Sequence, residues 1–225
     1  VFLPSAILAP ELQNMKKPLA ALATLVMLAT SGAAVAASSV DLTVTGLITP
    51  TACTPSLSAN GVVDHGKISA KDLSPTNWTR LPTSVLKLTI GCDAHTLFAV
   101  QATDNRAGSA TYSNSFGLGF VNGTQKLGQY DLEYGNPVNG DGGPLYPILS
   151  RDGGLTWMNN EEAITSPLEL LGFRDRPTGR EGPIPLKNVT ADLMVTTFIN
   201  ATNSWDMGQE EVEIDGLATL EVKYL

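Results

Sequence analysis

The chain has 225 residues, with 14 Lys and Arg against 22 Asp and Glu and a formal net charge of −8. Such an acidic balance argues against binding to nucleic-acid phosphates, which requires clustered basic residues. The 21 Gly and 14 Pro favour many turns and few long helices, without the composition of a disordered chain. Two cysteines are too few for a disulfide-dense mini-protein or a four-cysteine zinc site.

Residues 15–37 have the organisation of an export signal. Two lysines are followed by an apolar stretch over 19–29 and then by small residues that suit cleavage after Ala36 or Ala37. The apolar stretch is too short and too diluted by Thr, Ser and Gly for a transmembrane helix, so we expect no membrane span. Residues 1–14 precede the natural start and are interpreted as an upstream over-extension of the reading frame.

Export places the two cysteines in an oxidising compartment, where Cys53 and Cys92 are expected to pair. Closing a loop of this length is worth roughly 4 kcal/mol on the chain-entropy model. The alternative is a catalytic thiol, for which His95 is the nearest candidate base. Nothing else in the sequence supports that alternative, so a disulfide is favoured.

Apolar residues alternate with polar ones along most of the exported chain. The alternating runs lie at 40–48, 86–90, 98–102, 130–134, 189–195 and 214–224, and turn residues separate them. This pattern predicts an all-β sandwich whose strands each have one buried and one exposed face. The single helical candidate is 161–171, which Pro167 interrupts.

Four segments share an order and spacing with one known class of protein. The first segment, 38–53, alternates and places Gly46 seven residues before the first cysteine, and the second, 60–68, follows that cysteine. The third, 86–92, ends in the second cysteine, and the fourth, 218–225, alternates up to a penultimate Tyr. Together they resemble the pilins of chaperone–usher fimbriae. Three middle segments, 103–109, 116–120 and 126–134, resemble an uncharacterised family of pilin-like bacterial proteins.

Two features depart from an ordinary pilin. The exported chain is longer, and we place the extra length as an insertion between Asp104 and Glu181. The glycine expected near the C-terminus is displaced, since Gly216 lies ten residues from the end when Leu225 counts as one.

The resemblance implies an immunoglobulin-like sandwich over residues 51–225 that lacks one strand and is completed by a neighbour's N-terminal extension, here 38–50. This is donor-strand exchange. The side chains implied to enter the groove are Val40, Leu42, Val44 and Ile48, with Gly46 as a position without a side chain. The implied acceptor and chaperone-docking strand carries Ala218, Leu220, Val222 and Tyr224. The alternative, that 40–48 is the first strand of a complete sandwich, remains open.

The implied function is that of a structural subunit of a bacterial surface fimbria, contributing to adhesion. Its partners would be a periplasmic chaperone, an outer-membrane usher and other fimbrial subunits, with no nucleic acid. The alternative is a minor or tip subunit, or a secreted binding protein, that recognises a host or matrix ligand through 104–181. No catalytic constellation is visible, so we expect neither enzymatic activity nor a cofactor.

Several motifs are interpreted as structural. Residues 150–157 match the Asp-box pattern of sialidase propellers, and one copy predicts a stabilised β-hairpin. The run 139–143 lacks the ligands of a calcium loop and predicts a turn. His65 and His95 lack metal-ligand spacing and are interpreted as surface residues. The acidic stretch 210–215 is interpreted as a solvated turn, so no metal site is expected.

Overall fold

The computed structural model describes residues 40–46, 52–206, 208 and 211–225. These fall into two units, a short segment that ends at Gly46 and a domain that begins after it. The predicted leader, the residues ahead of it and Ile48 lie outside the described residues.

The domain consists of antiparallel strands joined by turns. The strands are β1 (Cys53–Leu57), β2 (Thr79–Arg80), β3 (Ser84–Thr96), β4 (Phe98–Asp104), β5 (Phe116–Gly117), β6 (Phe120–Val121), β7 (Gln125–Lys126), β8 (Gly128–Tyr134), β9 (Val138–Gly140), β10 (Gly143–Ser150), β11 (Met158–Asn159), β12 (Ile164–Thr165), β13 (Leu170–Arg174), β14 (Leu186–Ile199) and β15 (Ala218–Tyr224). Three short 3-10 helices lie at Ser58–Gly61, Ala70–Asp72 and Thr202–Ser204. No helix in the described part of the chain is long and apolar enough to cross a membrane.

The helix considered at 161–171 is wrong. This stretch contains β12 and the start of β13, and Thr165 of β12 pairs with Leu132 of β8. Pro167 removes a backbone donor that a helix would need, whereas the sheet uses the residues on either side of it.

One layer of the domain has the strand order β1-β3-β14-β8. The long strands β3 and β14 form its centre, and the short strands β2, β5, β9 and β12 extend it. Along β3, Leu86, Leu88 and Ile90 are buried while the residues between them are exposed. The alternation in the sequence therefore identified the buried face of this strand.

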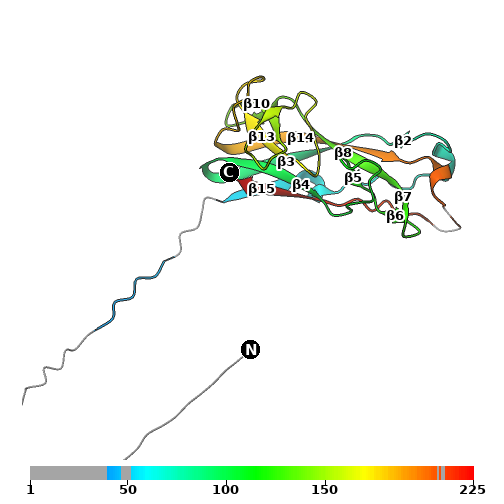
Figure 1. The fold of residues 1–225 in the computed structure, drawn as a ribbon, viewed down its shortest axis with the longest axis horizontal. Helices are drawn as coiled ribbons and strands as arrows, with labels where there is room; N and C mark the ends of the chain where they lie inside the picture. Colours follow the sequence, from blue (N-terminus) through cyan, green and yellow to red (C-terminus); the bar gives the residue numbers. More distant parts are fainter. Residues whose placement is uncertain (1–39, 47–51, 207, 209–210) are drawn as a thin grey trace, which may run out of the picture. The chain divides into compact units, whose positions relative to one another are not determined.

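The other layer has the order β10-β13-β4-β15. Strand β10 belongs to both layers, because 143–145 pair with β9 and 146–150 pair with β13. Figure 1 shows β4 and β15 below β3 and β14. Both layers contribute side chains to one core, among them Ile90, Val100, Phe173 and Leu193. The predicted all-β fold is confirmed.

Each layer ends in an edge strand with a single partner. Among the described residues, β1 pairs only with β3, and β15 pairs only with β4. An immunoglobulin sandwich orders its strands A-B-E-D and C-F-G. Here β1-β3-β14-β8 corresponds to A-B-E-D and β4-β15 to C-F, and no described strand takes the position of G beside β15.

Candidate functional site: an apolar groove between two sheet edges

A groove runs between the free edge of β1 and the free edge of β15. One wall consists of residues 53–73, and the other consists of residues 211–224. We call it the edge groove. It contains two hollows, a larger one of about 550 Å³ beside 63–73 and 211–214, and a smaller one of about 170 Å³ beside Leu57 and Leu220.

Both walls direct apolar side chains towards the core. Partly buried residues that pack on the core are Leu57, Val63, Ile68 and Leu73 from the first wall and Val212, Ile214, Ala218, Leu220 and Val222 from the second. The residues that alternate with them are mostly exposed. Each wall thus presents an apolar inner face and a polar outer face, as an extended strand does.

In the part of the chain that the structure describes, backbone pairing between the walls is missing along the groove. No described backbone hydrogen bond joins 61–69 to 211–217. The second wall is held from its other side, because Asp215 donates its N–H to Leu118 O at 3.1 Å and Asn105 donates to Leu217 O at 2.9 Å. An unpaired sheet edge of this kind is a template for an additional strand.

The floor of the smaller hollow comes from β3, β8 and β14. Leu86, Leu132, Leu193 and Tyr130 line it, and all four are buried. Burial raises the pKa of Tyr130, with a further contribution from Asp104, so the phenol is neutral. The floor is therefore uncharged and largely apolar.

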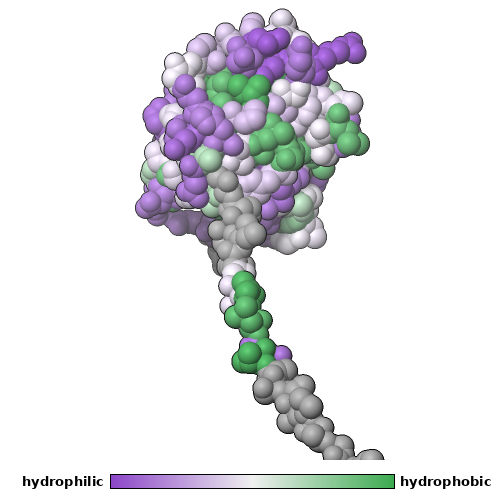
Figure 2. All heavy atoms as spheres, turned by 90° about the vertical axis from the view of Figure 1, so that its left-hand side faces the viewer, coloured by the Kyte–Doolittle hydropathy of each residue, from purple (hydrophilic) through white to green (hydrophobic). Residues whose placement is uncertain are grey.

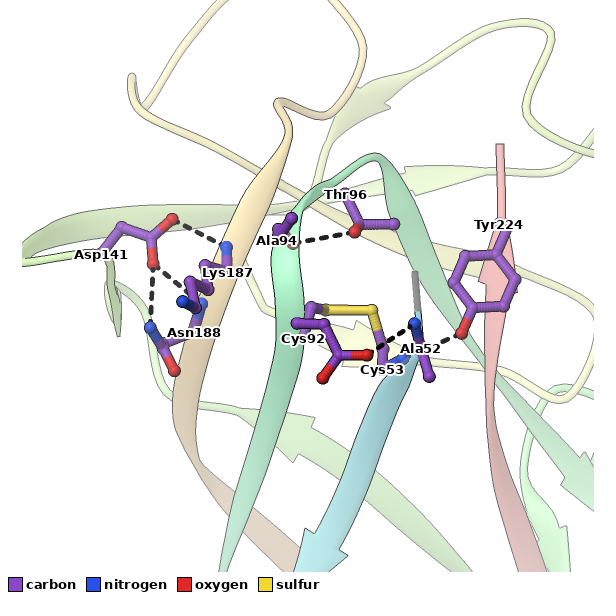
Figure 3. The surroundings of a disulfide bond; sticks show 10 residues. Ala52, Cys53, Cys92, Ala94, Thr96, Asp141, Lys187, Asn188 and Tyr224 are labelled. Carbon is purple, nitrogen blue, oxygen red and sulfur yellow. Dashed lines mark hydrogen bonds between the residues drawn. A yellow bond between two sulfur atoms is a disulfide. The ribbon is translucent and has the colours of Figure 1, made fainter. Parts of the chain in front are cut away.

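Polar contacts connect the two walls at both ends of the groove. At one end, Cys53 donates its N–H to the Tyr224 Oη at 2.9 Å (Figure 3). At the other end, Lys67 Nζ lies 2.8 Å from Glu211 Oε1, with side chains 90% and 88% exposed. An ion pair this exposed contributes little stability. The groove is thus bounded at the Cys53 end by a hydrogen bond and at the Lys67 end by a contact that opens easily.

The predicted disulfide between Cys53 and Cys92 is confirmed. The two residues are directly opposite each other in the β1–β3 ladder, so the bond fixes the edge strand to the centre of its layer (Figure 3). No free cysteine remains, and a catalytic thiol is therefore excluded.

Gly216 lies on the second wall where it passes over the core. A Cβ at this position would lie 3.0 Å from Tyr130 Cε1 and 3.1 Å from Leu118 Cδ2. A side chain here would push the wall away from the floor, which gives a steric reason for glycine.

His65 was interpreted from the sequence as a surface residue, and it lies at the surface of the edge groove. It is partly buried in the edge groove, and its Nε2 lies 3.0 Å from the Thr197 Oγ1 of β14. Burial lowers the pKa of His65, and the nearby Asp64 carboxylate partly opposes this. His95 is exposed, as expected, and lies 3.4 Å from Asp141.

Sequence reasoning missed His65 because its partner is distant in the chain. Thr197 is 132 positions away. The sequence nevertheless contained a signal, because inward-facing positions recur every second residue outside the regular strands. They do so at Val63 and His65 on the first wall and at Val212 and Ile214 on the second.

The predicted donor segment has no regular secondary structure over 40–46. Val40, Leu42 and Val44 are 94%, 88% and 87% exposed, and Figure 2 shows this apolar segment in green. A Cβ on Gly46 would meet nothing within 4 Å. Three large apolar side chains on one parity are thus exposed to solvent.

The predicted hairpin at 150–157 is confirmed. Strands β10 and β11 pair on either side of it, and Asp152 Oδ1 accepts hydrogen bonds from Ser150 Oγ at 2.7 Å and from Thr156 N at 2.9 Å. Hydrogen bonds from Thr156 and Ser150 lower the pKa of Asp152 to about 2. Trp157 closes the turn by donating Nε1–H to Gly154 O at 3.1 Å.

Asp141 and Asp215, two further acidic residues in the motifs considered above, are occupied by protein partners. Within the predicted turn at 139–143, Asp141 accepts backbone hydrogen bonds from Lys187 at 2.9 Å and Asn188 at 2.8 Å. Asp215 lies 2.6 Å from Arg106. The described residues contain no group of side chains arranged to hold a metal ion.

Comparison with known proteins places the chain among bacterial sequences of similar length. Residues 42–125 match a family described as "Protein of unknown function (DUF1120)". The chain is 27% identical to Protein GltF of Escherichia coli K12, over 90% of this chain and 95% of that protein. It is 28% identical to Uncharacterized protein YhcF of the same organism, over 83% of this chain and 90% of that protein. The family match covers the exposed segment from Leu42, both cysteines and the first wall of the groove.

Proposed function

We propose that this chain is a structural subunit of a bacterial surface fimbria, and that it polymerises by donor-strand exchange. The observation that carries the proposal is the edge groove, which has an apolar floor between two unpaired strand edges. The occupant is residues 38–50 of a neighbouring copy or related subunit. Strand addition of this kind combines main-chain hydrogen bonds with pockets for alternate side chains.

The chemistry of the segment complements that of the groove. An inserted strand directs every second side chain inward, and Val40, Leu42 and Val44 share that parity while Asp41, Thr43 and Thr45 face outward. Each large apolar side chain contributes about 1.5–3 kcal/mol when it is fully buried. The groove floor gains a similar benefit because its own apolar surface leaves water.

The exposure of 40–46 also bears on the alternative that these residues are the first strand of a complete sandwich. A first strand would have regular β-structure, and residues 40–46 have no regular secondary structure. This supports the donor interpretation over a closed sandwich.

The proposal assigns roles to the remaining sequence features. The signal at 15–37 exports the chain, a periplasmic chaperone protects the groove, and an outer-membrane usher exchanges the chaperone for the next subunit. The subunit then functions at the cell surface, where the fibre contributes to adhesion.

The test uses a chain that carries its own donor. Leu42→Asp and Val44→Asp inactivate the natural segment, and an intact copy of residues 38–50 is appended after Leu225 through a flexible Gly/Ser linker. The matched control has the same two Asp substitutions in the appended copy as well. We expect a clearly higher melting temperature at pH 7.5 for the intact copy, because only that copy can fill the groove. Equal melting temperatures would overturn the proposal.

A further inference from the structure

We propose that His65 makes occupation of the edge groove depend on pH: the groove accepts a donor strand when the imidazole is neutral and resists one when it is protonated. This inference rests on the proposed function of the groove and adds a condition under which it operates.

The location of His65 is the first argument. The two hollows share only three lining residues, Val63, His65 and Ile214. These residues therefore form the junction between the hollows, with His65 and Val63 on one wall and Ile214 on the other. A strand that extends through both hollows passes directly over the imidazole and removes it from water.

The hydrogen-bonding capacity of the site is the second argument. Among the described residues, His65 Nε2 has one hydrogen-bond partner, the Thr197 hydroxyl at 3.0 Å, and Thr197 is itself buried. The hydroxyl can donate to or accept from a neutral imidazole. An imidazolium has two N–H donors and a charge, and the neighbouring Val63 and Ile214 offer it no side-chain acceptor.

The third argument is that the charges around His65 do not keep its imidazole protonated. Asp64 precedes His65 in the chain, and Lys67, Glu211 and Glu213 line the larger hollow. Lys67 and Glu211 are paired with each other at 2.8 Å.

These charges do not decide the protonation state. The neutral phenol of Tyr130 lines the smaller hollow and adds no charge. Even with water in the groove, burial outweighs the attraction of Asp64 and lowers the pKa of His65. A donor strand adds burial and directs no carboxylate towards the ring, since its inward-facing residues Val40, Leu42, Val44 and Gly46 carry no charge. Its one carboxylate, Asp41, is on the outward-facing parity.

The sign of the effect follows from linkage. The pKa of His65 is lower in the filled groove than in the open groove, so insertion at low pH must release a proton. The affinity for the donor strand is then independent of pH above the pKa that His65 has in the open groove. Below it, affinity falls by up to about tenfold for each pH unit, until the filled-groove pKa is reached.

The experiment measures binding of a fluorescein-labelled peptide of residues 38–50 to the Leu42→Asp/Val44→Asp chain by anisotropy, from pH 7.5 to pH 5.0. We expect the dissociation constant to rise at least threefold as the pH falls. His65→Gln keeps a polar partner for Thr197 but does not titrate, so its dissociation constant should stay nearly constant. His95→Gln changes the only other histidine and should behave like the parent chain.

A second measurement does not depend on the His65→Gln variant folding. The imidazole of His65 is titrated by NMR in the appended-donor chain and in its matched control. The inference requires a lower pKa when the intact donor is present, and an equal or higher pKa overturns it. A dissociation constant that does not change with pH, or one that changes equally in His65→Gln, also overturns it. Absence of peptide binding at pH 7.5 would instead overturn the proposed function.

Discussion

At the scale of single residues, the groove depends on where side chains are missing as much as on where they are present. Gly216 allows the second wall to approach Tyr130 and Leu118 closely. His65 contributes the one titratable ring at the junction of the two hollows. Each role is defined by contacts between residues far apart in the chain.

Gly216→Val should destabilise the domain. The added side chain starts from a Cβ only 3.0 Å from the Tyr130 ring, and overpacking of this kind costs roughly 1–3 kcal/mol. Gly143→Val is the control, because a Cβ on Gly143 meets nothing within 4 Å. Urea unfolding of both variants measures the difference, and equal losses would contradict the steric role of Gly216.

Asp152 should titrate well below an ordinary aspartate. Its pKa is about 2 in the folded chain, against about 3.9 when unfolded. Its stabilising effect is therefore complete above pH 4 and disappears as the pH falls through about 2. Carboxyl ¹³C shifts give this value directly. Thr156→Val removes one donor and should raise the pKa, and an unchanged value would rule out the Thr156 hydroxyl as its cause.

At the scale of elements, the two edge strands are held in different ways. The disulfide and the ladder to β3 fix β1, whereas β15 is fixed by its ladder to β4. The walls of the groove therefore belong to different layers, and among the described residues the hydrogen bonds that join them lie at the ends of the groove.

Removal of the disulfide should loosen the first wall. The double variant Cys53→Ala/Cys92→Ala is expected to lose about 2–5 kcal/mol of unfolding free energy, because the loop it closes is long. The stabilisation given by an appended donor should also decrease, since β1 frays more easily from β3. Urea unfolding with and without the appended donor tests both points, and an unchanged donor effect would show that the wall does not need the disulfide.

Charged substitutions in the donor segment should prevent polymerisation only at the positions that face the groove. Leu42→Asp or Val44→Asp places a charge in an apolar groove and is expected to abolish polymers. Thr43→Asp or Thr45→Asp places the same charge on the outer face and should leave them intact. Multimer ladders on unheated gels provide the measurement. If both sets of substitutions abolished the ladders equally, Val40, Leu42 and Val44 could not be assigned to the face that enters the groove.

At the scale of the whole molecule, much of the fold could be predicted from alternation. The runs around Leu88, Val100 and Leu193 were identified as strands with the correct buried faces, because a two-residue period reports directly on a half-buried strand. The helix considered around Pro167 was wrong, because strand pairing with β8 decides the structure of that stretch.

The groove could be predicted only in outline. The resemblance suggested which strand is missing, but the walls meet through pairs such as Lys67 and Glu211, which are 144 positions apart. Sequence patterns over a few residues cannot reveal contacts between residues so far apart in the chain. The position of His65 at the junction between the hollows was therefore accessible only in three dimensions.

A chain that accepts but cannot donate should limit polymer length. The Leu42→Asp/Val44→Asp variant keeps its groove, so it can receive a wild-type donor but offers none in return. Added to wild-type chain during assembly, it should shorten the polymers in proportion to its fraction, as seen by sedimentation or electron microscopy. The appended-donor variant of the same chain has a filled groove and should have no effect. Equal shortening by both would contradict exchange through the groove.

The meeting of Cys53 with Tyr224 has a consequence for symmetry. The first wall begins where the second ends, so the N-terminal extension joins the domain at one end of the groove. In donor-strand exchange, one subunit contributes its N-terminal extension and its neighbour contributes its edge groove. The two surfaces differ, so the contact is heterologous. A two-fold dimer can satisfy both surfaces only if its two chains exchange their extensions reciprocally. In an open chain, by contrast, one groove and one extension stay unmatched at opposite ends, so the proposed exchange gives such a polymer a direction and no intrinsic final size.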